Sequence, residues 1–178
     1  MAIDLSSAYD LVDHDILIEK SRLMSVGKTC TNWLKNFLSK RSQFVELDGT
    51  KSQTIQCGSE GVVQGGPSSG ELFVIFLNSL PIYSIPAVAT SNMFVDDLSS
   101  VISGETEADL TKNVIEEFNR VQEYLIEHKM KINPSKTQLM FINPSLTQKS
   151  TPIPIEGSPI MHQDQMRILG LNLSSDLK

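Results

Sequence analysis

The stretch SNMFVDDLSSV, residues 91 to 101, places two carboxylates between two short runs that favour β-strands. A turn at Asp96 and Asp97 would make the two runs a hairpin with both carboxylates at its tip. Adjacent aspartates repel each other and disfavour strand interiors, so they must either face water, as in an ordinary solvated turn, or lie near a cation. The rest of the sequence decides between these alternatives.

A third carboxylate, Asp4, ends the short apolar run AID at the start of the chain. A sheet that pairs this run with the hairpin would bring Asp4 against Asp96 and Asp97. Three clustered carboxylates cannot all remain ionised without a cation. Magnesium is held by carboxylates together with substrate phosphates, and a pair of such ions can clamp an attacking and a leaving oxygen. The three aspartates therefore indicate a magnesium site at one edge of a sheet.

The composition indicates a soluble domain without a membrane partner. The chain has 178 residues, 40% of them hydrophobic, which is enough to bury a core. Cys30 and Cys57 are too few for a disulfide framework and lack zinc-site spacing, so we expect an intracellular, reducing compartment, nuclear or cytoplasmic. No apolar run is long enough to span a membrane, and MAIDLSSAYD has no signal-peptide pattern. The formal charge of −6 argues against a broad basic surface for nucleic acid.

Local patterns predict helices and hairpins in mixed order. Residues 105–129 carry an apolar stripe at helical spacing, and Thr106 with Asp109 resembles a capping box. Asp48-Gly49 lies between two β-favouring runs and predicts a hairpin. Shorter helices are expected over residues 13–27, around Trp33, Leu34, Phe37 and Leu38, and over 70–80.

The fold class follows from the order of these elements. Two further strands are predicted, TQLMFI (137–142) and RILGLNL (167–173), separated by a Pro-rich loop over residues 143–160. Strands and helices in mixed order, with hairpins, indicate an α+β fold. We expect one antiparallel sheet with the helices packed on one face.

Five blocks of the sequence, taken in order, resemble the reverse transcriptases of non-LTR retrotransposons. AIDLSSAYDLVDHDIL (2–17) resembles the first catalytic block of that family, GVVQGGPSSGELFVIFLNSLP (61–81) the second, and FVDD (94–97) the paired-aspartate block. INPSKTQLMFI (132–142) looks like the block after the palm helix, and RILGLNL looks like the primer-gripping hairpin. Five blocks in order are far more specific than any single motif.

The resemblance implies that the α+β fold is a polymerase palm-like antiparallel sheet with helices packed on one face. It also implies an RNA-directed DNA polymerase that binds an RNA template, a DNA primer and deoxynucleoside triphosphates. Asp4, Asp96 and Asp97, with the main-chain carbonyl of Leu5, would hold two Mg²⁺ ions, for which Mn²⁺ can substitute. The remaining matched positions are Tyr9 under the incoming sugar, Gln64, Gly65 and Gly66 against template and nucleotide, and Lys136 at the departing pyrophosphate. Ordinary structural readings stay open for Tyr9 as a half-buried tyrosine and for Lys136 as a solvated lysine. His14 also fits the pattern, and we assign it the structural role of fixing the turn into the first helix.

Departures from the family pattern limit the inference. Ser7 stands where a basic residue is common, Val63 replaces the usual proline before Gln64, and Val95 replaces a frequent alanine. The chain opens inside the first catalytic block, so we expect residues 1–178 to be a single palm region with the fingers truncated and the thumb absent. An isolated palm keeps its acidic centre and loses basic walls, which accounts for the negative charge.

Two other functions compete with an active polymerase. One is a catalytically inactive retroelement remnant that binds nucleic acid weakly or not at all. The other is a metal-dependent nuclease that uses the same carboxylates, which has little support because no further acidic motif or catalytic histidine completes it. The sequence does not indicate the template or the oligomeric state.

Overall fold

In a computed structural model of the chain, which describes residues 1–80, 87–142, 153–155 and 158–177, the predicted hairpin around the two aspartates is present. Its strands are β6 (Ala89–Phe94) and β7 (Asp97–Ile102), paired antiparallel. The strand β1 (Ala2–Ile3) pairs antiparallel with the other edge of β7. The sheet order is therefore β1-β7-β6, and the second strand of the hairpin lies at its centre.

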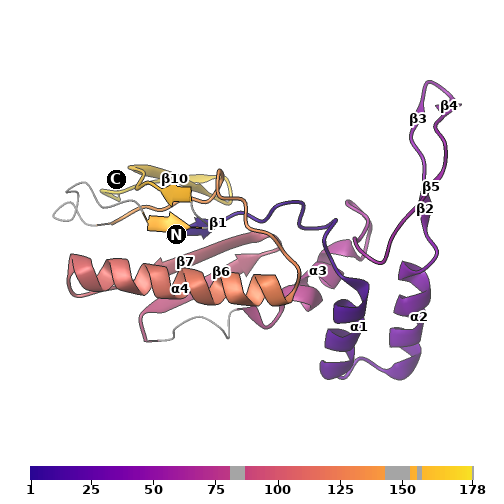
Figure 1. Ribbon diagram of the computed structural model, residues 1–178, viewed down its shortest axis with the longest axis horizontal. Helices are drawn as coiled ribbons and strands as arrows, with labels where there is room; N and C mark the ends of the chain where they lie inside the picture. The colour runs from indigo at the N-terminus through magenta and orange to yellow at the C-terminus, as the bar shows by residue number, and fades with distance from the viewer. Residues whose placement is uncertain (81–86, 143–152, 156–157, 178) are drawn as a thin grey trace. The chain divides into compact units, whose positions relative to one another are not determined.

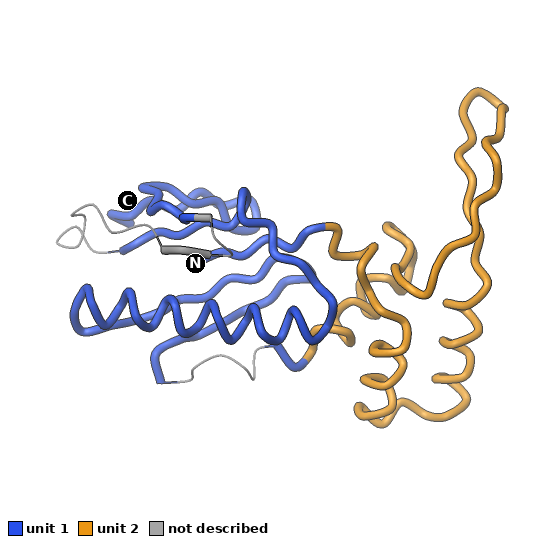
Figure 2. Tube along the Cα trace, viewed as in Figure 1, with its two compact units in different colours: residues 1–6, 79–178 blue, residues 7–78 orange. Residues whose placement is uncertain are grey.

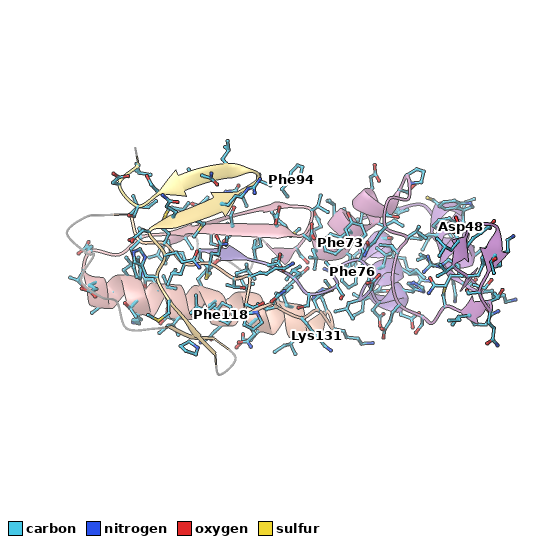
Figure 3. All side chains as sticks on the ribbon, turned by 90° about the horizontal axis from the view of Figure 1, so that it is seen from above. Asp48, Phe73, Phe76, Phe94, Phe118 and Lys131 are labelled. Atoms are coloured by element: carbon cyan, nitrogen blue, oxygen red, sulfur yellow. The ribbon has the colours of Figure 1, made fainter. Side chains whose placement is uncertain are left out.

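The long helix α4 (Glu107–Glu127) packs against β7 (Figure 1). It begins where predicted, because the Thr106 side chain accepts a hydrogen bond from the Asp109 main-chain N–H at 3.1 Å. Phe118, labelled in Figure 3, is 2% exposed and lies in the middle of the buried face. The other buried side chains of α4 are Val114, Glu117, Val121, Tyr124 and Leu125. The predicted apolar stripe is thus confirmed, with one carboxylate buried within it.

Two smaller hairpins follow α4. The strands β10 (Gln165–Ile168) and β11 (Leu171–Ser174) form the hairpin predicted for RILGLNL. The strands β8 (Ile153–Ile155) and β9 (Ser158–Ile160) pair antiparallel inside the segment predicted as a Pro-rich loop over 143–160. Residues 143–152 and 156–157 of that predicted loop lie outside the described part of the chain. The segment 137–142 makes isolated β-bridges at Gln138 and Leu139 in place of the predicted strand.

Residues 7–78 contain three helices and a long β-ribbon. The helices α1 (His14–Leu23) and α2 (Lys28–Leu38) lie side by side, and α3 (Ser69–Leu77) packs on α1 (Figure 1). Phe73 and Phe76 of α3 are fully buried. The ribbon consists of β2 (Ser42–Gln43), β3 (Glu46–Leu47), β4 (Thr50–Lys51) and β5 (Ile55–Gln56). Its tip is the predicted turn, where Asp48 and Gly49 have φ angles of +50° and +77°, as a type I′ turn requires.

The chain divides into two compact units, residues 1–6 with 79–178 and residues 7–78 (Figure 2). That residues 1–178 form a single palm region stays a prediction. The first unit holds the sheet, α4 and the C-terminal hairpins. The second holds α1 to α3 and the ribbon. No helix among the described residues is both long and apolar enough to cross a membrane.

Replacing Phe118 by alanine should destabilise the first unit by about 3–5 kcal/mol, because the change leaves a cavity between α4 and the sheet. Ile126→Ala on the same helix is the matched control, since Ile126 is 63% exposed; it should change the free energy of unfolding by less than about 0.5 kcal/mol. Urea denaturation followed by circular dichroism measures both. Similar losses in the two variants would contradict the packing described for α4.

Candidate active site

The register of β1 on β7 places Asp4 beside Asp97. Ile3 pairs with Leu98 in this register, Asp4 follows Ile3, and Asp97 precedes Leu98. Antiparallel neighbours at such positions lie within about 5 Å of each other at Cβ. Two of the three predicted carboxylates are therefore brought together at one end of the sheet, as the sequence analysis expected.

Asp96 occupies the turn of the same hairpin. Phe94, labelled in Figure 3 at the end of β6, pairs with Asp97, so Val95 and Asp96 form the two-residue turn. Val95 has a φ of +57°, which is an unusual and strained value for a β-branched residue. Strained turns of this kind gather at functional sites, where the surrounding structure holds them in place. The strained residue, Val95, is thus the one that replaces a frequent alanine of the family pattern.

The three carboxylates repel one another electrostatically. The pKa of Asp97 is raised above its normal value of 3.8, first by desolvation of the part of the side chain that neighbouring atoms cover and then by the negative charges of Asp96 and Asp4. Because the residue as a whole is exposed, we regard the two neighbouring charges as the firmer cause. Both neighbours therefore lie close enough to repel the ionised form of Asp97. Asp4 and Asp96 are half-buried, whereas Asp97 is exposed. A bound cation would reduce the repulsion at Asp97.

Lys136 supplies a positive charge at this cluster. Its Nζ lies 3.7 Å from Oδ2 of Asp4. The main chain around it is held in place, because the Asn133 N–H donates to the Asp4 carbonyl at 2.8 Å and the Lys136 N–H donates to the Asn133 carbonyl at 3.2 Å. The Lys136 side chain is 67% exposed, and ion pairs this exposed contribute little to stability. The Lys136 ammonium group thus lies beside the Asp4 carboxylate but is held there only weakly.

A pocket of about 490 Å³ opens next to the carboxylates. Asp4, Asp97 and Lys136 line it, together with Arg167 of β10 and Gln138. Gln138 accepts a hydrogen bond from the Arg167 main-chain N–H at 3.4 Å through its Oε1. No role in the site was predicted from the sequence for Arg167 or Gln138. A signal was available for Arg167, because it is the one basic residue of the predicted strand 167–173.

Tyr9, Gln64, Gly65 and Gly66 lie in the second unit. Tyr9 stacks on Phe73 with 5.1 Å between ring centroids, and its main-chain carbonyl accepts a hydrogen bond from the Val62 N–H at 2.8 Å. Gln64 and Gly65 are exposed, and Gly65 has a φ of +73° that favours glycine. A Cβ on Gly66 would lie 2.6 Å from Oγ of Ser69. The placement of these residues beside the carboxylates stays a prediction.

His14 has a structural partner in the second unit. Its Nε2 lies 2.8 Å from the carbonyl oxygen of Gly61, which also accepts a hydrogen bond from Nη2 of Arg41 at 2.5 Å. His14 is buried at the first position of α1. The two side chains hold the loop that runs into Gln64. The role of His14 in fixing the turn into the first helix is consistent with this geometry, which adds Arg41 as a second donor.

The carboxylate oxygens at this end of the sheet are the kind of ligand that a hard divalent cation such as Mg²⁺ prefers. Among the described residues, no group of three or more histidine, cysteine, aspartate or glutamate side chains is gathered tightly enough to form a metal cage. Magnesium does not need one, because it is usually held by one or two carboxylates together with water and substrate phosphates. Asp4 and Asp97 meet that requirement. The side chain of Leu5 is apolar and buried, so its predicted part in the site rests on the main-chain carbonyl alone.

Comparisons with known proteins agree with the fold. The family model described as reverse transcriptase (RNA-dependent DNA polymerase) matches residues 1–173. Among solved structures, an apo telomerase from Candida tropicalis truncated from the C-terminal domain is similar, with a TM-score of 0.66 and 16% sequence identity. The match covers 99% of this chain and 34% of that one, so this chain spans about a third of the telomerase chain. A comparison with curated proteins returned no match.

Asp97→Asn should stabilise the protein at neutral pH. Because the pKa of Asp97 is raised in the folded state, ionisation of this side chain opposes folding; the penalty is absent below the normal value of 3.8 and is complete once the pH exceeds the raised pKa. Melting temperatures of parent and variant, measured from about pH 7 down to about pH 4, should therefore converge as the pH falls. Asp48→Asn, in the turn between β3 and β4, controls for the loss of one negative charge. A variant that melts below the parent at neutral pH would show that Asp97 is not repelled there.

Proposed function

Because this chain belongs to the reverse transcriptase family, whose model matches residues 1–173, we propose that it carries the nucleotidyl-transfer site of an RNA-directed DNA polymerase. The observation that supports the proposal is the β1–β7 pairing, which puts Asp4 beside Asp97 next to the turn at Asp96. The proposed reaction is attack of a primer 3′-hydroxyl on the α-phosphate of a deoxynucleoside triphosphate, directed by an RNA template. The proposed origin is a non-LTR retroelement, with residues 1–178 as its palm region.

We propose that Asp4, Asp96, Asp97 and the Leu5 main-chain carbonyl hold two Mg²⁺ ions, or Mn²⁺ in their place. Bound divalent cations supply the positive charge that such a reaction needs at the attacking and leaving oxygens. The contribution of the chain is to hold its carboxylates at the end of a hydrogen-bonded sheet, which orients them before substrate arrives. The repulsion that raises the pKa of Asp97 supports this assignment, since a cation would relieve it.

Lys136 is proposed to act on the departing pyrophosphate, as an acid or as a fixed positive charge. Its exposed ion pair with Asp4 leaves the ammonium group able to turn toward a phosphate in the pocket. Arg167 lines the same pocket and would add a second positive charge. These two residues are the basic side chains of the described pocket lining.

Tyr9 and the loop of Gln64, Gly65 and Gly66 are proposed to contact the incoming nucleotide and the template. The stacking of Tyr9 on Phe73 fixes the plane of its ring, as a platform under a sugar requires. The exposed main chain at Gly65 lets a ligand approach closely.

A catalytically inactive remnant is the second candidate. The formal charge of −6 favours it, because approach to a polyanion is opposed rather than steered. A remnant would keep the fold and lose primer extension. The two candidates predict different results when the rest of a polymerase is supplied. An active site would then support primer extension, whereas a remnant would not.

Magnesium or manganese should stabilise the parent chain and stabilise Asp96→Asn less. A cation that binds only the folded state adds about 1.4 kcal/mol at ten times its dissociation constant, and the affinity should be weak without substrate phosphates. Thermal melts with and without the metal measure the effect, and Asp48→Asn is the control for net charge. Equal stabilisation of the parent and Asp96→Asn would mean that the cation binds elsewhere.

Residues 1–178 on their own should not extend a primer. Phosphoryl transfer depends on positioning and charge stabilisation, and the described pocket offers two basic side chains to a triphosphate and a duplex. The measurement is incorporation of labelled deoxynucleotide on a primed RNA template with Mg²⁺, compared with Asp96→Ala/Asp97→Ala. Template-dependent synthesis above that control would show that these residues suffice.

A chimaera tests the catalytic assignment itself. Residues 1–173 replace the corresponding segment of a related, active reverse transcriptase, and extension should survive in the chimaera. Asp96→Ala/Asp97→Ala in the chimaera should reduce it by at least about 100-fold, the scale of losing a group that stabilises transition-state charge. A chimaera that is folded and binds the primed template but does not extend it would favour the inactive remnant.

A further inference from the structure

The ribbon of the second unit carries aliphatic side chains on one face. Ile55 pairs with Gln43 and Leu47 pairs with Thr50, and paired residues of an antiparallel ribbon point to the same side. Gln43, Val45 and Leu47 alternate along the chain, so they share that side. Val45, Leu47 and Ile55 therefore lie on one face, where their exposed fractions are 71%, 73% and 62%.

A bulge keeps Ile55 on this face. The pairs Gln43–Ile55 and Glu46–Lys51 enclose residues 44–45 on the outgoing strand and residues 52–54 on the returning strand. The extra residue therefore lies on the returning strand, as in a β-bulge, and the alternation of the outgoing strand is kept. Without it, Ile55 would point to the side opposite Val45.

The charged side chains of the ribbon strands lie on the opposite face. Glu46 pairs with Lys51, and Nζ of Lys51 lies 3.7 Å from Oε2 of Glu46 and 4.7 Å from the centroid of the Phe44 ring. We call the side formed by Gln43, Val45, Leu47, Thr50 and Ile55 the ribbon face. None of its five residues is charged.

The described residues of the second unit leave the ribbon face largely exposed. The ribbon extends away from α1, α2 and α3 (Figure 2). An antiparallel sheet with alternating apolar and polar residues normally packs its apolar face on a core, and a two-stranded ribbon alone is only marginally stable in water. We therefore expect another surface to cover the ribbon face.

The two ends of the ribbon carry opposite charges. Lys40 is exposed where the chain enters the ribbon, and Asp48, labelled in Figure 3, is exposed in the turn at its tip. Val45 lies near the middle of this segment. Two identical ribbons laid face to face in opposite directions would place Lys40 of each copy opposite Asp48 of the other, and Val45 opposite its own copy.

We propose that the ribbon face binds the ribbon face of a second copy of this chain, with the two ribbons running in opposite directions. A contact between two identical surfaces must be self-complementary, and an uncharged apolar face meets this condition because no like charges oppose each other. Lys40 and Asp48 then form two equivalent ion pairs across the ends. A nucleic acid would meet no positive charge on the face, so it is a poorer match.

The association should be weak, because the ribbon face is much smaller than the roughly 20–30 residues a side of a standard interface. We expect a dissociation constant above about 1 µM. The chain is then monomeric in a dilute melting experiment, where Asp48→Asn remains a control for net charge. The contact uses none of the carboxylates next to β1, so Asp96→Ala/Asp97→Ala should associate like the parent.

Sedimentation equilibrium of residues 1–178 between about 5 µM and 500 µM measures the association. The parent should change from monomer to dimer over this range. Val45→Asp should weaken association by at least about 100-fold, because two carboxylates would meet near the symmetry axis. Ile126→Asp on α4 is the matched control, since Ile126 is 63% exposed and lies outside the ribbon, and it should associate like the parent. Circular dichroism melts check that both variants are folded.

A mixture of two charge-reversal variants tests the antiparallel arrangement. The dimer of Lys40→Glu alone opposes acidic residues at both ends, and that of Asp48→Lys alone opposes lysines, so each should associate roughly tenfold more weakly than the parent. In an equimolar mixture, the mixed dimer has one reversed and one original ion pair, so association should return close to that of the parent. A folding defect in either variant would not be repaired by mixing.

Disulfide formation locates the symmetry axis. In a Cys30→Ser/Cys57→Ser background, which removes both native thiols, Val45→Cys should crosslink to its own copy under mild oxidation. Phe44→Cys, on the opposite face, should crosslink much less. A parent that stays monomeric up to about 500 µM, a dimer unchanged by Val45→Asp, or equal crosslinking at positions 44 and 45 would overturn the proposal. Mixed variants that associate no better than either alone would overturn the antiparallel pairing.

Discussion

The antiparallel pairing of Ile3 with Leu98 is the interaction on which the candidate site depends. It joins the start of the chain to the centre of the sheet and so brings Asp4 beside Asp97. The strand β1 is only two residues long, but the chain around it has partners on its other side as well: the Ala2 N–H donates to the Gln138 carbonyl, and the Asn133 N–H donates to the Asp4 carbonyl, both at 2.8 Å. A short segment held on both edges keeps a carboxylate in place better than a free end would.

A buried polar network ties the same hairpin to α4. Glu117 is fully buried, and its Oε1 accepts a hydrogen bond from the Ser91 hydroxyl at 2.8 Å. The Ser100 hydroxyl lies 2.7 Å from Oγ of Ser91, and the two serines pair across β6 and β7. A buried carboxylate is costly unless it is hydrogen-bonded, so this network favours one position of the hairpin on the helix.

Amphipathic patterning at α2 predicts the helix but not which of its apolar side chains are buried. Trp33, Leu34, Phe37 and Leu38 cluster at helical spacing and correctly predict a helix, but the structure buries only the two leucines. Four apolar residues on successive turns cover more of the helix circumference than one neighbouring helix, α1, can bury. The aromatic pair is therefore left exposed.

The sequence by itself determined the local elements and the identity of the carboxylates. The Asp96-Asp97 hairpin, the Asp48-Gly49 turn and the Thr106 cap each depend on residues a few positions apart, where turn chemistry and side-chain hydrogen bonds act without tertiary help. Tertiary structure decided which of these elements meet. The β1–β7 register, the pocket shared by Lys136 and Arg167, and the burial of Glu117 all join segments distant in the chain. Such contacts arise from the packing of whole surfaces, which no short stretch of sequence encodes.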